Sequence, residues 1–288
     1  MKALSFGEIL WDVYPDKKFL GGAPLNFAAH LKKHGENVYM MSALGNDELG
    51  KEAIKRIEDW KINTSYILSL DDKPTGSCMV ALDENKVPSY NLLKDVAYDY
   101  ISYIDIKESF DVLYFGTLAL RSENNYNTLK TLIDSVRFKC IFSDINIRPP
   151  FYSEKTVRFA AENANVLKIS IEELGKAAEM LKISYTDYKD FCKKISYKHK
   201  NLKLIIITLG ENGAYAFDCE NNKDYSCDSI KVEEKSTVGA GDSFSAAFMH
   251  KYIKKESIEN CLIHASKIAG YVVSEYDAVP DYNIEDFI

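Results

Sequence analysis

Apolar positions follow two patterns along most of this chain, short unbroken runs and stretches with helical spacing. Short, nearly unbroken apolar runs predict buried β-strands at 2–6, 37–42, 111–116, 139–145, 166–169 and 202–208. Between them, stretches with helical spacing predict α-helices at 25–34, 47–60, 123–136, 153–163, 171–181 and 185–197. Strands that alternate with helices favour a mainly parallel sheet, so we expect an α/β fold.

Two segments break this alternation. Residues 9–20 are too irregular for a helix, and residues 64–93 are rich in Thr, Ser, Val and Tyr without a helical period. We expect two to four short strands in 64–93, which combine with 9–20 in a small sheet standing off the main domain. A strand at 214–218 and helices at 242–254 and 258–274 complete the chain. Because no flexible linker or internal repeat interrupts them, the 288 residues predict a single domain.

Charge and cysteine usage narrow the classes of function. The net charge of −7 argues against nucleic acid as the main partner, because phosphate backbones require clustered Lys and Arg. No apolar stretch reaches the roughly 18 residues that a membrane span needs. The six cysteines form no Cys-x-x-Cys pair, so we expect reduced thiols in a cytoplasmic protein.

The clearest chemistry lies in Gly239-Ala240-Gly241-Asp242, directly before an apolar helix. Glycines let the backbone approach a ligand closely, and amides at a helix N-terminus attract phosphate oxygens. A carboxylate in such a cradle would repel phosphate, so Asp242 makes more sense as a general base that takes a proton from an attacking hydroxyl group. The residues alone leave a second interpretation open, in which the loop only caps the helix.

Beyond these residues, the chain resembles the ribokinase-like (PfkB) family of sugar kinases over essentially its whole length. Five family motifs occur in family order, at Gly21-Gly22-Ala23-Pro24-Leu25-Asn26-Phe27-Ala28, Lys73-Pro74-Thr75-Gly76, Asp144-Ile145-Asn146-Ile147-Arg148-Pro149, Thr208-Leu209-Gly210-Glu211-Asn212-Gly213 and Thr237-Val238-Gly239-Ala240-Gly241-Asp242. Gly-Gly-Ala-Pro and the residues at 7–12 are most similar to the fructokinase branch. The resemblance implies a ribokinase-like three-layer sandwich with a mainly parallel central sheet and a small β-sheet lid, at about 9–20 and 64–93.

The resemblance also implies roles for individual residues. Asp242 would be the base, and the amides of Gly239, Ala240 and Gly241 would hold the charge on the transferred phosphoryl group. The sugar would contact Asp12, Gly22, Asn26, Tyr90 and Arg148, and Arg148 would reach phosphates or an anionic substrate. The expected cofactors are ATP, beside Thr208, Gly210, Gly213 and Ser266, and Mg²⁺, with Glu173 as the metal-associated acid.

Three serines depart from the family pattern. Ser236 stands where potassium-activated members have an acid, which makes K⁺ a doubtful cofactor here. Ser170 replaces the Asn of the magnesium-associated Asn-x-x-Glu motif, although its acid, Glu173, is present. Ser266 stands where the late helix often has an Asn near adenine.

From these observations we expect an ATP-dependent kinase that phosphorylates a monosaccharide, with fructose as the first choice of substrate. Alternatives are a kinase for ribose, 2-keto-3-deoxygluconate or a nucleoside, and a catalytically silent sugar or nucleotide sensor. A sensor has no need of a base at Asp242, which favours the enzyme. The partners are then the small sugar and ATP rather than nucleic acid or a membrane. The exposed strands of the lid suggest a homodimer, because unpaired strand edges invite pairing.

Overall fold

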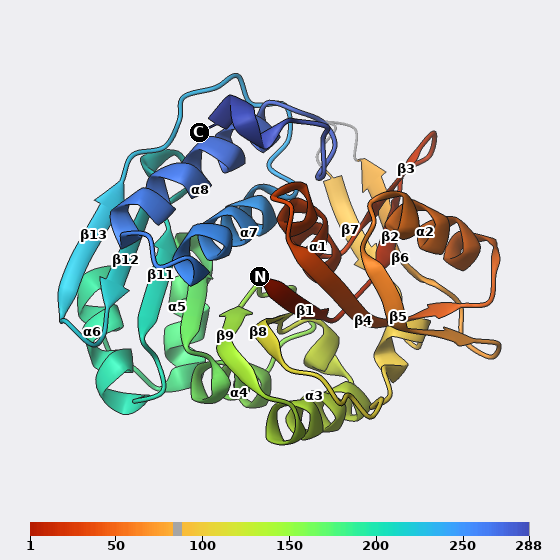
Figure 1. The fold of residues 1–288 in the computed structure, drawn as a ribbon, viewed down its shortest axis with the longest axis horizontal. Coiled ribbons are helices and arrows are strands. Elements are labelled where there is room, and N and C mark those ends of the chain that lie inside the picture. Colours follow the sequence, from red (N-terminus) through yellow and green to blue (C-terminus); the bar gives the residue numbers. More distant parts are fainter. Residues whose placement is uncertain (83–87, 288) are drawn as a thin grey trace.

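A nine-stranded sheet runs through the middle of the molecule (Figure 1). The computed structural model describes the backbone of residues 1–82 and 88–287, and of these the side chains outside 80–90. The strands lie in the order β13 (Lys223–Cys227), β12 (Ala214–Asp218), β11 (Leu204–Thr208), β10 (Val166–Ser170), β9 (Phe138–Asp144), β8 (Phe110–Gly116), β1 (Lys2–Phe6), β4 (Asn37–Gly45) and β5 (Asn63–Leu70). Strands from β11 to β5 pair in parallel, and β12 and β13 are antiparallel.

Helices cover both faces of this sheet, which explains its nearly continuous apolar strands. One face packs against α1 (Ala23–Lys33), α2 (Glu48–Asp59), α7 (Ala240–Ile253) and α8 (Ile258–Val273). The other packs against α3 (Glu123–Ser135), α4 (Glu154–Asn163), α5 (Ile171–Leu181) and α6 (Tyr188–Lys198). Successive strand residues point to opposite faces. Leu204 therefore packs in the first core and Ile205 in the second.

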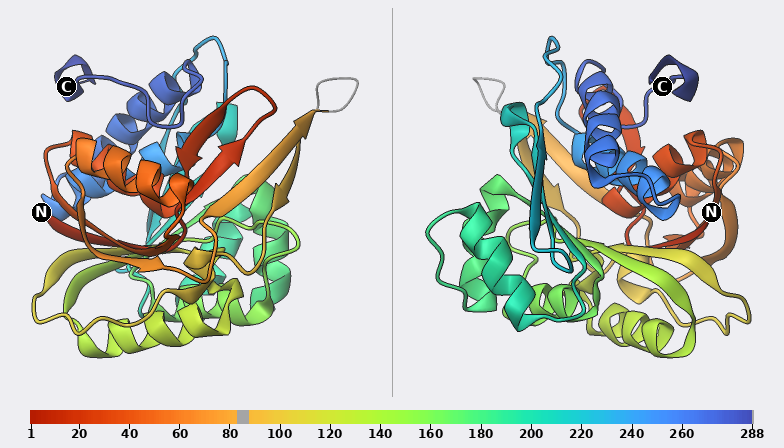
Figure 2. Two further views of the ribbon diagram at one scale, coloured as in Figure 1. Left: turned by 90° about the vertical axis from the view of Figure 1, so that its right-hand side faces the viewer. Right: turned by 60° about the vertical axis from the view of Figure 1, so that its left-hand side comes forward.

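Four strands form a separate small sheet in the order β3 (Lys18–Gly21), β2 (Leu10–Val13), β6 (Gly76–Leu82) and β7 (Pro88–Leu92). Figure 2 shows this sheet projecting from the body formed by the large sheet and its helices. The α/β fold with a mainly parallel central sheet and a second, small sheet is confirmed. None of the helices in the described residues is long and apolar enough to cross a membrane.

The prediction was wrong for two edge strands. The start of the segment 64–93 belongs to β5, which pairs with β4 in the large sheet, so the small sheet draws only on 76–92 of that segment. β13 was not expected because its sequence, Lys-Asp-Tyr-Ser-Cys, is mostly polar. Both are edge strands, which pair with one neighbour only. The polar side chains of β13 hide it in the sequence, whereas β5 was expected as a strand but assigned to the wrong sheet.

Candidate active site

The carboxyl ends of the parallel strands open into a cavity of about 780 Å³, bordered on one side by the small sheet. Residues at or just beyond the ends of β1, β9, β10 and β11 line it, namely Glu8, Asp144, Ser170 and Thr208. The N-termini of α1 and α7 reach the same cavity through Gly22 and Gly239. Ligand sites of open α/β sheets form at this edge, since loops and helix N-termini converge there.

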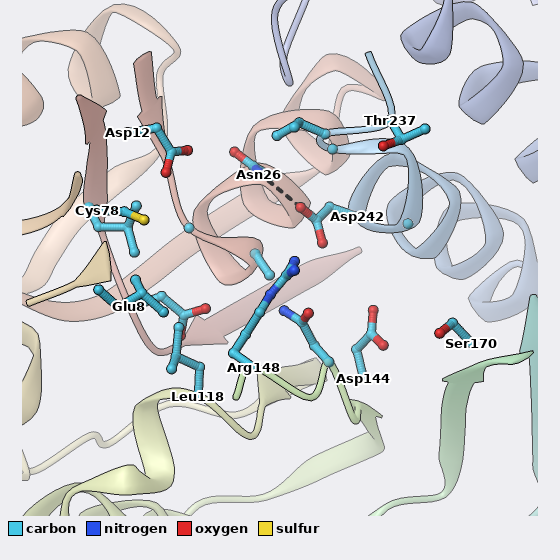
Figure 3. A pocket seen from close by; sticks show the side chains of 18 of the residues that line it. Glu8, Asp12, Asn26, Cys78, Leu118, Asp144, Arg148, Ser170, Thr237 and Asp242 are labelled. Carbon is cyan, nitrogen blue, oxygen red and sulfur yellow. Dashed lines mark hydrogen bonds between the residues drawn. The ribbon is translucent and has the colours of Figure 1, made fainter. Parts of the chain in front are cut away.

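Asp242 and Asn26 meet across the cavity (Figure 3). The Asn26 amide on α1 donates a hydrogen bond of 2.8 Å to Oδ2 of Asp242 in the first turn of α7. Burial raises the pKa of Asp242 to about 6, and the hydrogen bond from Asn26 works against that rise. The carboxylate is therefore mostly ionised at neutral pH and basic enough to accept a proton.

The loop before Asp242 depends on Gly239. This residue caps α7 with φ at +82°, and a Cβ atom there would lie 2.5 Å from the carbonyl oxygen of Ala278. Gly239 and Gly241 line the cavity. Ala240 is turned away from them, because its N–H donates to the carbonyl oxygen of Thr237. The predicted cradle therefore faces the cavity at its two glycines, while Ala240 supports the turn.

The residues predicted for sugar binding converge on the half of the cavity next to the small sheet. Asp12 on β2, Gly22, Asn26 and Arg148 all line it. Burial raises the pKa of Asp12 to about 6, and the positive charge of Arg148 opposes the rise. Tyr90 lies on β7, but its side chain is outside the part of the chain whose side chains the structure describes.

Glu8 also lines this half and was missed by the sequence analysis. Its side chain is only 1% exposed, and Oε2 has no hydrogen-bond partner in the described residues. Burial raises the pKa of Glu8 to about 7, and the charge of Asp242 adds to the rise. A signal was available, because Glu8 is an acid inside an apolar run between two strands.

A second missed group is the buried ion pair between Lys168 on β10 and Asp144 at the end of β9. Both side chains line the cavity, and Ser245 on α7 also hydrogen-bonds Asp144. A Cβ atom on Gly241 would lie 3.3 Å from the Lys168 ammonium nitrogen. The positive charge therefore sits directly beside the N-terminal turn of α7. Its signal in the sequence was a lysine within an apolar strand.

Residues predicted for ATP and metal divide into two groups. Thr208 and Glu173 line the far half of the cavity, whereas Gly210, Gly213 and Ser266 are not among its lining residues. A Cβ on Gly213 would lie 2.0 Å from the carbonyl oxygen of Cys227, so this glycine permits close packing. The Ser266 hydroxyl contacts the sulfur of the same cysteine at 3.1 Å. Ser266 is therefore part of the α8–β13 contact.

Glu173 is held by hydrogen bonds to the backbone of two other segments. Its two carboxyl oxygens accept backbone N–H groups from Ile147 and Ser170, and Ser170 caps α5 in return. Across the described residues, no three His, Cys, Asp or Glu side chains are grouped as a metal site would need.

Comparisons with known proteins agree with this geometry. The family profile described as pfkB family carbohydrate kinase matches residues 6–284. An uncharacterized sugar kinase of Pyrococcus horikoshii is 27% identical over 92% of this chain and 83% of its own length. A 5-dehydro-2-deoxygluconokinase of Listeria monocytogenes is 24% identical over 97% of this chain and 89% of its own.

Solved structures share the fold at lower identity. The fructokinase of Vibrio cholerae, solved with fructose, ADP and calcium, superposes with a TM-score of 0.84 at 19% identity, covering 99% of this chain and 98% of its own. The aminoimidazole riboside kinase of Salmonella enterica gives a TM-score of 0.83 at 18% identity, covering 100% and 99%. The same fold thus serves kinases of different substrates.

Proposed function

The chain belongs to the pfkB family of carbohydrate kinases, and from its cavity we infer that it transfers the γ-phosphoryl group of ATP to a hydroxyl group of a neutral monosaccharide, with fructose as the first candidate. The observation that carries this proposal is the Asn26–Asp242 hydrogen bond at the N-terminus of α7. This hydrogen bond supports the assignment of Asp242 as the base for the sugar hydroxyl, because the carboxylate lies beside backbone amides that suit phosphate oxygens. A sensor would need no carboxylate with a raised pKa at that point.

The charge of the lining supports a neutral acceptor over a sugar acid. Six acidic side chains line the cavity, namely Glu8, Asp12, Asp144, Glu172, Glu173 and Asp242, against the two cations Arg148 and Lys168. Lys168 is already paired with Asp144, which leaves Arg148 to balance the acids around Asp242. An anionic sugar would meet net repulsion there, whereas hydroxyl groups can donate hydrogen bonds to carboxylates.

In the proposed mechanism Asp242 accepts the proton of the attacking hydroxyl group. Asn26 holds the carboxylate in place, and Asp12 orients other hydroxyls of the sugar. Lys168 and the N–H groups at the start of α7 stabilise negative charge on the transferred group. We assign Thr208, which lines the far half of the cavity, to the binding of ATP. Mg²⁺ bound to ATP supplies further neutralisation of phosphate charge. Glu173 would help to hold this metal, although backbone N–H groups already engage both of its carboxyl oxygens.

A monovalent-cation requirement is not part of the proposal. Ser236 offers a hydroxyl dipole where a carboxylate would be needed for tight K⁺ binding, and that hydroxyl already accepts the N–H of Val238 at 3.2 Å. We expect the initial rate at fixed Mg²⁺ and ionic strength to change less than about twofold when a bulky organic cation replaces K⁺. A severalfold loss would contradict this expectation. The cytoplasmic location and the homodimer stay predictions.

The direct test is ADP release from the purified protein with ATP, Mg²⁺ and a panel of acceptors. The panel contains fructose, ribose, other neutral monosaccharides, a nucleoside and 2-keto-3-deoxygluconate. The proposal expects a neutral sugar to give the highest kcat/KM, at least tenfold above the sugar acid. Highest activity with the acid would overturn the neutral-substrate assignment. Sugar binding by calorimetry without any turnover would favour the sensor.

A further inference from the structure

Two buried polar atoms in the sugar half of the cavity lack protein partners. They are Oε2 of Glu8 and Oδ1 of Asn26, and neither has a hydrogen bond within the described residues. Their side chains are 1% and 4% exposed, and both line the cavity. Buried polar groups are nearly always hydrogen-bonded, because leaving one unpaired costs free energy. A partner from outside the chain is therefore expected at this point.

Both unpaired atoms can accept hydrogen bonds, Oε2 of Glu8 when its carboxyl group is ionised. The Asn26 amide nitrogen already donates to Asp242. The unpaired atom of Asn26 is therefore its amide oxygen, Oδ1. Ionised Glu8 offers only acceptors. The missing partner must therefore bring donors. A hydroxyl-bearing sugar provides them, whereas a phosphate or a second carboxylate would add more acceptors.

We propose that Glu8 is a substrate-binding residue whose carboxyl group accepts a hydrogen bond from a sugar hydroxyl, next to the hydroxyl that Asp242 activates. This assignment rests on the proposed function. Glu8 lies two residues after the end of β1, and Gly22 at the start of α1 packs against its backbone. A Cβ atom on Gly22 would lie 2.4 Å from the Glu8 carbonyl oxygen. This close approach fixes Glu8 between the ends of two rigid elements.

The charged and titratable groups around Glu8 make its role depend on pH. Asp242 lies on α7, Arg148 in the segment after β9, and Tyr114 on β8. Tyr98 and Arg121 lie in the helical turns at 97–100 and 119–121. Burial and Asp242 favour the protonated form and raise the pKa of Glu8 to about 7, while the two arginines oppose the rise. A hydroxyl donor favours the ionised form. Sugar binding therefore lowers the pKa of Glu8 and strengthens as pH rises from 6 to 8.

The first experiment is the Glu8→Gln variant, which keeps the shape and removes the charge. The loss of a hydrogen bond to a charged acceptor predicts a rise of about tenfold to a hundredfold in sugar KM. The kcat should stay within about threefold, and the KM of ATP should not change. The dependence of sugar KM on pH between 6 and 8 should also weaken. A variant with unchanged sugar KM, or with kcat alone reduced, would overturn the assignment.

The second experiment pairs the variant with monodeoxy analogues of the accepted sugar. In the wild type, the analogue that lacks the hydroxyl bound by Glu8 should bind about tenfold or more weakly than the parent. In Glu8→Gln that difference should shrink, because only a neutral amide oxygen remains to accept the hydrogen bond. Equal sensitivity of both proteins to every analogue would show that Glu8 touches no hydroxyl.

Calorimetry on the wild type covers the case in which Glu8→Gln fails to fold. At pH 7, sugar binding in two buffers of different ionisation enthalpy should release protons, since binding lowers the pKa of Glu8. Zero release or proton uptake would contradict the proposal. A wild type that neither binds nor phosphorylates any sugar would instead refute the proposed function itself. Phosphorylation with no effect of Glu8→Gln would refute only the role of Glu8.

Discussion

The Asn26 amide and the Asp242 carboxylate lie 2.8 Å apart although 216 residues separate them in the chain. One belongs to the first turn of α1 and the other to the first turn of α7. Each side chain thus positions the other at the point where two helix N-termini meet (Figure 3).

Asp242→Asn should lower kcat by at least about a hundredfold, the usual scale for loss of a general base. The variant keeps an oxygen that can accept the Asn26 hydrogen bond, so the KM values for sugar and ATP should stay within about threefold. Steady-state kinetics with the accepted sugar measures both quantities. Turnover within tenfold of the wild type would rule out Asp242 as the base.

Asn26→Leu should move the acidic limb of the kcat/KM profile to higher pH. The hydrogen bond from Asn26 favours the ionised form of Asp242, so its removal raises the pKa of Asp242 above the present value of about 6. Activity in the variant is therefore lost earlier as pH falls. Sugar KM should rise as well, because Asn26 lines the sugar half of the cavity.

A matched control for this profile is Asn127→Leu, which changes an exposed residue of α3 on the opposite face of the sheet. Its pH profile should coincide with that of the wild type. An acidic limb in Asn26→Leu that stays in place, or moves to lower pH, would show that the hydrogen bond does not tune Asp242.

Lys168→Met should reduce kcat by about a hundredfold, since the ammonium group lies beside the N-terminal turn of α7 where phosphoryl charge would develop. The single change also leaves Asp144 as an unpaired buried charge, which costs about 3–5 kcal/mol of stability. The double variant Lys168→Met/Asp144→Asn should recover much of that stability in urea unfolding. Its turnover should remain low. Recovery of wild-type turnover in the double variant would mean that Lys168 only neutralises Asp144.

Gly22→Ala and Gly35→Ala together test the close contact between Gly22, at the start of α1, and the Glu8 backbone. Both glycines have positive φ, +110° and +79°, so alanine is strained at either position. A Cβ on Gly35 meets nothing within 4 Å, whereas one on Gly22 would collide with the Glu8 carbonyl oxygen. We expect a loss of about 1–2 kcal/mol for Gly35→Ala and at least about 2 kcal/mol more for Gly22→Ala.

Kinetic constants distinguish a loss of folding stability from a change in the sugar-binding site. Gly22→Ala should displace Glu8 and raise the sugar KM, while Gly35→Ala should leave all kinetic constants unchanged. Chemical denaturation and steady-state kinetics on both variants measure the two effects. Equal losses of stability would show that the contact with Glu8 relaxes at little cost.

Local signals in the sequence were enough for most helices and buried strands. The predicted helix at 171–181 coincides with α5, because Ser170 caps it and its apolar positions repeat with helical spacing. The strand at 2–6 coincides with β1 for a similar reason, since its apolar run ends at a glycine. The Gly-Ala-Gly-Asp run likewise predicts a helix N-terminus without help from other segments. Each of these features depends on residues a few positions apart.

The tertiary structure alone decided which distant segments meet. Edge strands such as β5 and β13 acquire their place from a neighbouring strand, and that pairing leaves little trace in their own pattern. The sequence marks Glu8 and Lys168 as ionisable groups in apolar runs, which predicts burial. The groups that act on them, the like charge of Asp242 on Glu8 and the paired carboxylate of Asp144 on Lys168, come from other elements that converge at the carboxyl edge of the sheet. Electrostatic interactions act through space, so the raised pKa of Glu8 and the ion pair of Lys168 follow from packing rather than from chain order.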